Sequence, residues 1–313
     1  MAKVIFDTNG YRNLVSTKTF EEIDDCIALI KVKEKENDIE TMFSPIVAQE
    51  LLAHLADKND NAFDRCLRAN KAMYLHNGDR AQVNMFPMFE ALLAHMYFND
   101  TPAKRIETYN AIAQISMHLA LNPNEATFAI FHDKLQTIKA SVDMGEAGFV
   151  DGMFQFVKQT DPAATDWMPF RNDPKKRQKL LTGLRSDGAS YEIAKGYIFM
   201  THINLIENGH SNIYSAEQIT DFSKSVLEKF PEPIALFKTV IENLVNSDFP
   251  LDQASRANFV WDIALMFGAG KHSIGNDKLY FVTGDKAIIN TAIRQGSGTS
   301  VLTLQEYLDY IGV

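Results

Sequence analysis

The chain has 313 residues, of which 46% are hydrophobic and 23% charged, and its formal net charge is −9. This length is typical of one large globular domain or two ordinary ones, and so large a core needs no disulfide to stabilise it. The acidic balance argues against a protein that binds nucleic acid through its overall field, although a local basic face is compatible with it.

Three features indicate a cytoplasmic protein. The two cysteines, Cys26 and Cys66, match no metal-binding spacing, so we expect two free thiols in a reducing compartment. The N-terminus lacks an apolar run long enough for a signal peptide. No stretch of eighteen or more apolar residues is present, so no membrane span is expected.

The first 56 residues alternate strand and helix signals. The apolar run 3–6 predicts a buried strand, and 39–43 predicts a second one. Between them, Thr19 and Glu22 form a capping-box pattern that opens a helix ending near residue 35. Ser44 then predicts the cap of a further helix, because proline follows it at the first helical position.

Helical periodicity replaces this alternation from residue 57 to about residue 252, and no convincing strand pattern occurs there. The predicted helices are 85–97, 102–121, 125–139, 175–184, 191–207, 217–230 and 233–245.

The alternation returns at residue 253, with helices at 254–267 and 285–294, strands at 279–283 and 300–302, and a last helix capped by Thr303. The sequence therefore predicts an α/β fold, an open parallel sheet flanked by helices. We expect residues 1–56 and 253–313 to form its two halves. Residues 57–252 would be a large all-α insertion, which is tolerated where its two ends lie close together at the surface.

Four acidic residues are the candidates for a functional site. Asp7 and Asp285 each follow a predicted strand, and the carboxyl ends of parallel strands meet in one crevice. Glu50 shares a helix face with apolar residues, and Asp262 lies in a strongly apolar helix. Structural roles are also open: helix caps for the two strand-end acids, a solvated helix acid for Glu50, and an ion pair with Arg256 or Lys271 for Asp262.

Several carboxylates in one place repel each other unless they bind a divalent cation. Mg²⁺ and Mn²⁺ prefer carboxylate oxygens, and such ions activate water for attack on a phosphodiester. Asp7, Glu50, Asp262 and Asp285 are therefore predicted as metal ligands and catalytic residues. Thr8 and Asn9 are predicted to orient Asp7 or a metal-bound water, and Thr283 is predicted to do the same for Asp285.

A basic run, Lys175, Lys176 and Arg177, is the densest in the chain, and Lys286 follows Asp285 directly. Phosphate contacts need such positive charge, so these four residues are candidate nucleic-acid contacts. A short basic run at the start of a helix is more often a solvated face.

Four segments together resemble the PIN-like nuclease family: 4–9 with its Asp-Thr-Asn, 44–51 with Glu50, 261–264 with Asp262, and 281–286 with its Thr-Gly-Asp. The order of these motifs and the strands and helices around them resemble a PIN-like domain that carries a large helical insertion. The resemblance implies a metal-dependent endonuclease with a nucleic acid as its partner. RNA is expected rather than DNA on this ground alone.

Two other functions remain open from the sequence. One is an inactive PIN-like module whose helical insertion binds a protein partner. The other is a metal-dependent phosphohydrolase that acts on a small phosphate ester. A covalent aspartyl-phosphate route is disfavoured because Asn9, and not an aspartate, stands two residues after Asp7. A protein regulator or a second copy of the chain is also open as a partner.

Overall fold

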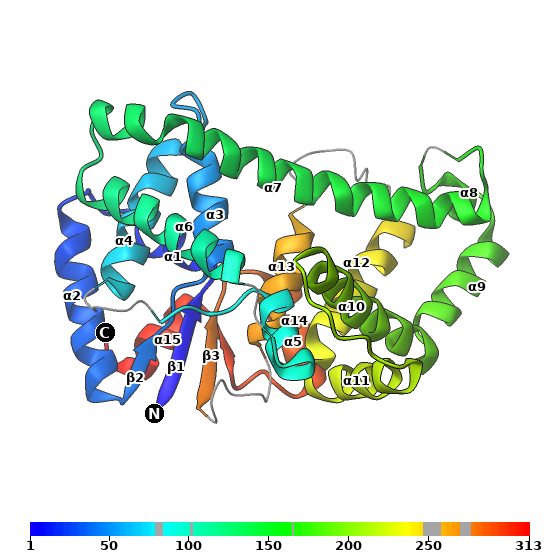
Figure 1. The fold of residues 1–313 in the computed structure, drawn as a ribbon. Helices are drawn as coiled ribbons and strands as arrows, with labels where there is room; N and C mark the ends of the chain where they lie inside the picture. The colour runs from blue at the N-terminus through cyan, green and yellow to red at the C-terminus, as the bar shows by residue number, and fades with distance from the viewer. Residues whose placement is uncertain (79–83, 101–102, 165, 247–257, 270–276) are drawn as a thin grey trace. The chain divides into compact units, whose positions relative to one another are not determined.

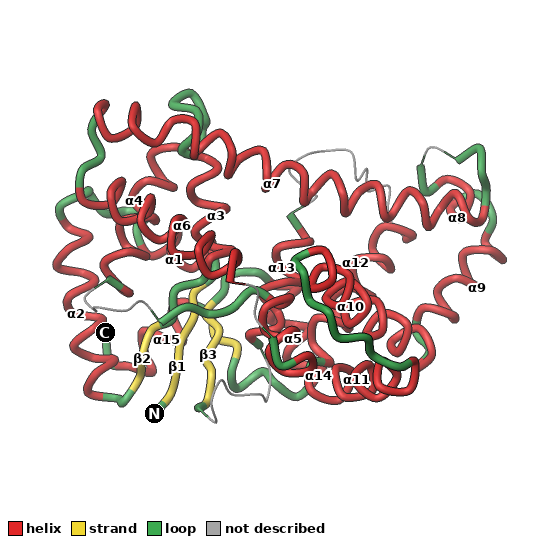
Figure 2. Tube along the Cα trace, viewed as in Figure 1, coloured by secondary structure: helices red, strands yellow, loops and turns green. Residues whose placement is uncertain are grey.

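The computed structural model describes all residues except 79–83, 101–102, 165, 247–257 and 270–276. The described chain is mostly helical and contains one small parallel sheet, as Figures 1 and 2 show. The predicted α/β class is therefore confirmed in this coarse sense. Among the helices in the described ranges, none is long and apolar enough to cross a membrane.

The sheet consists of four short strands in the order β2-β1-β3-β4, and every neighbouring pair is parallel. The strands are β1 (Ala2–Phe6), β2 (Ile39–Thr41), β3 (Lys278–Val282) and β4 (Val301–Leu302). The predicted strand 39–43 ends early, and Phe43 forms only an isolated bridge with Met85. Because the strands are parallel, their carboxyl ends lie at one edge of the sheet.

Strand β1 is central and buried on both faces, which explains its unbroken apolar run. Phe6 packs on one face, where its ring lies 5.3 Å from the ring of Tyr307. Ile5 points to the other face and fills the space above Gly268. A Cβ atom at Gly268 would lie only 2.6 Å from Cδ1 of Ile5, so this close approach requires a glycine.

The predicted helix starts of the N-terminal segment are confirmed. Helix α1 (Thr8–Leu14) follows β1 directly, and α3 (Pro45–His54) begins after Ser44, whose hydroxyl accepts a hydrogen bond from the amide of Val47. Thr19 and Glu22 make the reciprocal bonds of a capping box, although α2 (Glu22–Glu36) itself begins at the glutamate.

The C-terminal elements are also confirmed. Helix α14 (Lys286–Gln295) starts after Asp285 and ends at Gly296, whose φ of 79° is the left-handed conformation that glycine favours. Thr303 opens α15 (Leu304–Ile311) with a complete capping box. Of the predicted helix 254–267, residues 254–257 lie outside the described residues, and the rest forms α13 (Phe259–Leu265) and a short 3-10 turn at 266–268.

The middle of the chain is helical, as predicted, and no strand occurs among the described residues of 57–252. Its helices are α4 (Phe63–Asn77), α5 (Phe89–Phe98), α6 (Ala103–Leu121), α7 (Glu125–Thr160), α8 (Met168–Arg171), α9 (Pro174–Leu184), α10 (Asp187–Glu207), α11 (Ala216–Lys229) and α12 (Pro231–Asn246).

The largest differences from the prediction are in α4 and α7, and the short helix α8 was also not predicted. Helix α4 was not predicted, because polar residues interrupt its buried face; Asn70 and His76 are both buried there. Helix α7 runs 21 residues past the predicted end at 139. This extension contains three glycines, and glycine disfavours the interior of a helix, so the sequence predicts an earlier end. At one of them, Gly145, an added Cβ would lie 2.9 Å from the ring of Trp261, so this glycine admits a close packing partner.

The chain divides into two compact units. The first comprises 1–92, 100–142 and 268–313, and the second comprises 93–99 and 143–267. These boundaries differ from the predicted insertion 57–252, because α4 and α6 pack with α3 in the first unit. The second unit has its own core, in which the ring of Phe98 lies 4.9 Å from that of Tyr214.

Candidate active site at the carboxyl end of the sheet

The pairing of β1 with β3 brings two distant polar residues together. Phe6 is the partner of Val282, so Asp7 and Thr283 come next on the two strands. The amide of Asp7 donates to the carbonyl of Val282 at 3.0 Å. The hydroxyl of Thr283 donates to Oδ2 of Asp7, and the amide of Gly10 donates to Oδ1. Both oxygens of this carboxylate therefore accept at least one hydrogen bond.

Asp7 is a buried carboxylate, with 3% of its surface exposed. Burial raises the pKa of Asp7 from 3.8 to about 6, despite the opposing hydrogen bonds from Thr283 and Gly10. The nearby charge of Asp285 makes a smaller contribution to this increase in pKa. The charged form of Asp7 is thus disfavoured here unless a positive group compensates it.

Asp285 lies beside Asp7 and caps α14. Its Oδ1 accepts hydrogen bonds from the amides of Ala287 and Ile288, at 2.6 and 3.0 Å. Its own amide donates to the hydroxyl of Thr283 at 3.0 Å. Thr283 therefore connects the two aspartates, which refines its predicted role as a partner of Asp285 alone. In the described chain, no hydrogen bond uses Oδ2 of Asp285.

Glu50 reaches the same end of the sheet from α3. The hydroxyl of Thr8, the first residue of α1, donates to Oε2 of Glu50 at 2.6 Å. Thr8 thus orients Glu50, whereas the sequence predicted that it would orient Asp7 or a water. Asn9 is exposed, and its side chain makes no hydrogen bond within the described ranges.

Asp262 is half-buried on α13, and it belongs to the second compact unit. The ion-pair partners considered for it, Arg256 and Lys271, lie outside the described residues. The structure therefore joins Asp7, Glu50 and Asp285 through the two threonines, while the place of Asp262 in this site stays a prediction.

The predicted basic residues are found in both units. Lys175 and Lys176 are exposed at the start of α9 in the second unit, where their amides donate to the carboxylate of Asp173. Arg177 is half-buried in the same helix. Lys286 is exposed in the first unit, directly after Asp285.

No group of three or more His, Cys, Asp or Glu side chains that could hold a metal ion occurs among the described residues. Asp7, Asp285 and Glu50 therefore do not form a closed ligand shell. Mg²⁺ does not need one, because it keeps several waters and binds proteins through one or two carboxylates.

Sequence reasoning missed three arginines close to this site, Arg12 on α1 and Arg65 and Arg68 on α4. The three-residue spacing on α4 places the last two on one helix face. That spacing could have identified them if α4 itself had been predicted.

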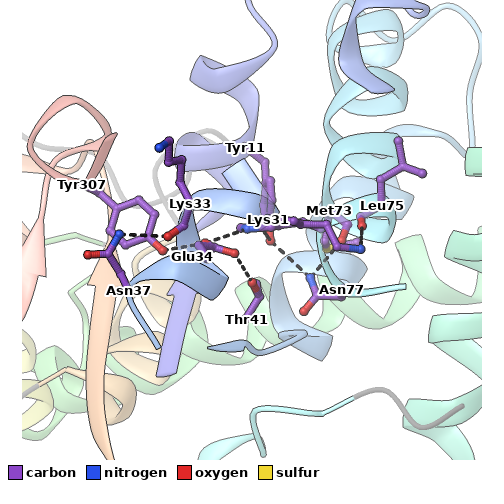
Figure 3. Close-up of polar contacts among 11 residues, drawn as sticks. Tyr11, Lys31, Lys33, Glu34, Asn37, Thr41, Met73, Leu75, Asn77 and Tyr307 are labelled. Atoms are coloured by element: carbon purple, nitrogen blue, oxygen red, sulfur yellow. Dashed lines mark hydrogen bonds and ion pairs between the residues drawn. The ribbon is translucent and has the colours of Figure 1, made fainter. Parts of the chain in front are cut away.

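A second polar cluster, also missed, lies on the same unit around Glu34 (Figure 3). The ring of His76 contacts Oε1 of Glu34 at 2.9 Å, and the hydroxyl of Tyr307 donates to the same oxygen at 2.5 Å. The hydroxyl of Thr41 donates to Oε2 of Glu34 at 2.9 Å. Burial alone would raise the pKa of Glu34, but the charge and hydrogen bond of His76, with the two hydroxyls, hold it below its ordinary value.

The cluster around Glu34 borders a pocket of about 460 Å³, which Asp7 and Asp285 do not line. A pocket is the usual place for a ligand. Here, however, the buried carboxylate already has three partners, which together link α2, β2, α4 and α15. This arrangement is typical of a satisfied structural network. The chemistry of the strand-end acids therefore identifies the better candidate site.

No protein-family model, curated protein or solved structure matches this chain.

Proposed function

We propose that this protein is a metal-dependent nuclease of the PIN-like type that hydrolyses phosphodiester bonds. One observation carries the proposal: Asp7 and Asp285 follow neighbouring parallel strands and share Thr283, whose hydroxyl donates to one and accepts from the amide of the other. Two carboxylates held together in this way at the carboxyl end of a sheet are unfavourable alone and suit a divalent cation.

The residues present fit Mg²⁺ or Mn²⁺. Burial and the charge of Asp285 raise the pKa of Asp7, which disfavours its charged form. A bound cation would stabilise that charged form. Oδ2 of Asp285 is engaged by no hydrogen bond of the described chain, and every carboxylate oxygen has two lone pairs. Asp7 and Asp285 would hold the ion, and Glu50 would contact it directly or through water.

The bound ion would supply an activated water at neutral pH and stabilise the leaving oxygen. The other polar groups of the site orient the acidic side chains. Thr283 fixes the orientation of Asp7, and Thr8 fixes that of Glu50. The amides at the start of α14 keep Asp285 in its place after β3. Asp262 is proposed as a fourth acid of the site.

RNA is the proposed substrate because the four motifs resemble PIN-like nucleases. Lys286 follows Asp285 directly and is a candidate for contact with a substrate phosphate, and Lys175, Lys176 and Arg177 are further candidates.

The second candidate is an inactive PIN-like interaction module. It is favoured by the observation that both strand-end aspartates cap helices, since Asp7 accepts from the amide of Gly10 and Asp285 from those of Ala287 and Ile288. Helix capping alone is a sufficient structural reason for an aspartate at such a position.

The experiment compares wild type, Asp7→Asn and Asp285→Asn on single- and double-stranded RNA and DNA, with Mn²⁺, with Mg²⁺ or with EDTA. Asparagine caps a helix about as well as aspartate, so both variants should keep their fold. The nuclease proposal predicts metal-dependent cleavage by wild type and loss of cleavage in both variants.

The matched control is Asp133→Asn, the same substitution at a fully exposed site of the first unit. It should cleave like wild type. Wild-type protein that cleaves none of the four substrates with either metal would favour the inactive module. Cleavage that survives both strand-end substitutions would contradict the proposed site.

A further inference from the structure

Three arginines lie together at the junction of α1 and α4. Arg65 is close enough to Arg12 and Arg68 that their positive charges lower its pKa, an effect second to that of its own partial burial. The Nε atom of each of the three is buried, and none of these atoms has a hydrogen-bond partner. Arg12, Arg65 and Arg68 thus form an arginine cluster.

No ion pair joins the arginine cluster to a carboxylate of the described chain. Elsewhere in the first unit, by contrast, several basic side chains are paired with carboxylates. Lys71 pairs with Asp24, and Arg105 pairs with Glu90. Three neighbouring guanidinium groups that repel one another are unfavourable unless an anion compensates them.

The arginine cluster is tied to the acidic end of the sheet through Asn13. A guanidinium nitrogen of Arg65 donates to Oδ1 of Asn13 at 3.0 Å. The amide nitrogen of the same asparagine lies against Gly284, where an added Cβ would be 3.2 Å from it. Gly284 stands between Thr283 and Asp285, so one side chain spans the distance from the cluster to the acids.

A shared neighbour, Cys66, places the cluster near Glu50. The buried thiol of Cys66, which lies between Arg65 and Arg68 in the sequence, responds to the charges of both Arg12 and Glu50. Helices α1, α3 and α4 pack against one another within the first unit, which keeps these charges on neighbouring elements.

We propose that Arg12, Arg65 and Arg68 bind neighbouring backbone phosphates of the nucleic-acid strand that the acidic site cleaves. The inference rests on the proposed nuclease function, because it assigns the groups that hold the substrate beside that site. Arginine suits this task, since its planar guanidinium can donate two parallel hydrogen bonds to one phosphate. The positive cluster also offsets the repulsion between a polyanion and the carboxylates of the site.

The test measures binding separately from cleavage. Wild type and the triple variant with Arg12, Arg65 and Arg68 changed to Gln are titrated against fluorescein-labelled single-stranded RNA in EDTA, over a series of salt concentrations. Each lost phosphate contact should reduce the slope of log affinity against log salt by about 0.7. The triple variant should therefore bind more weakly and lose about 2 from that slope.

The control is the variant with Lys158, Lys195 and Lys224 changed to Gln, which removes the same number of positive charges from exposed sites of the second unit. An affinity and salt slope of the arginine variant that match those of this control would overturn the inference, as would wild-type protein that binds no RNA. If the triple variant does not fold, the three single Arg→Gln variants replace it, each with an expected slope change of about 0.7.

The two proposals fail in different ways. RNA binding that depends on the arginine cluster, without cleavage in Mn²⁺ or Mg²⁺, would overturn the nuclease and leave the phosphate site standing. Metal-dependent cleavage together with unchanged binding by the arginine variant would overturn the phosphate site alone.

Discussion

The hydroxyl of Thr283 donates a hydrogen bond to the carboxylate of Asp7, a residue 276 positions earlier in the chain. The bond exists because β1 and β3 pair in parallel and end at the same level. It fixes a buried carboxylate beside a second one, Asp285, and most of the expected behaviour of the site follows from this arrangement.

In the absence of divalent ions, the Asp7→Asn variant should be more stable than wild type at neutral pH. The pKa of Asp7 is about 6 in the folded protein and 3.8 in the reference state, so the folded protein binds the proton more tightly. The stability that this proton contributes is present below about pH 4 and is lost as the pH rises through about 6. The difference of about 2 pKa units corresponds to about 3 kcal/mol.

Urea unfolding of both proteins in EDTA at several pH values measures this effect. The stability advantage of the variant should grow from about pH 4 to about pH 7 by up to about 3 kcal/mol. A difference that does not change with pH would show that Asp7 has an ordinary pKa.

Mn²⁺ or Mg²⁺ should stabilise the wild-type protein, because the ion binds the folded state and compensates the buried charge. At a concentration 100 times the dissociation constant, the expected gain is about 2.7 kcal/mol, seen as a higher melting temperature. The Asp7→Asn and Asp285→Asn variants should show little of this gain, and Asp133→Asn should show all of it. Equal stabilisation of all four proteins would place the ion elsewhere.

Replacing Gly10 by alanine should disturb the site although all of its acidic residues are kept. The added Cβ would lie 3.0 Å from Oδ1 of Asp7 and 3.2 Å from the carbonyl oxygen of Val282, which belongs to the central pair of strands and cannot easily move. We expect a loss of about 1 to 3 kcal/mol in stability and weaker cleavage. The control is Gly183→Ala in α9, where the Cβ meets open space and alanine should stabilise the helix.

The Glu34→Ala variant should be strongly destabilised, by about 3 to 5 kcal/mol, because it leaves His76, Thr41 and Tyr307 without their shared acceptor. Because the pKa of Glu34 is lowered in the folded protein, its ionised carboxylate contributes to stability above the ordinary glutamate pKa. This stability is lost as the pH falls through the lower pKa of the folded state. Denaturation at neutral and acidic pH measures both effects. The matched change of the exposed Glu36 to alanine should alter stability by less than about 1 kcal/mol.

The sequence determined the features that depend on a few neighbouring residues. The capping patterns at Thr19, Ser44 and Thr303 all make their expected hydrogen bonds, because a cap needs only residues within one helical turn. The strand positions and the placement of Asp7 and Asp285 after them were also predictable, since a short apolar run bounded by polar residues is a local signal.

The tertiary structure alone decided what joins distant residues. The helix α4, the full length of α7 and the division into compact units depend on packing that no local pattern records. The bond between Thr283 and Asp7 depends on strand register, and the arginine cluster depends on the packing of α1 against α4. Charge repulsion and burial act through space, so the sequence could identify the acids of the site but not the arginines beside them.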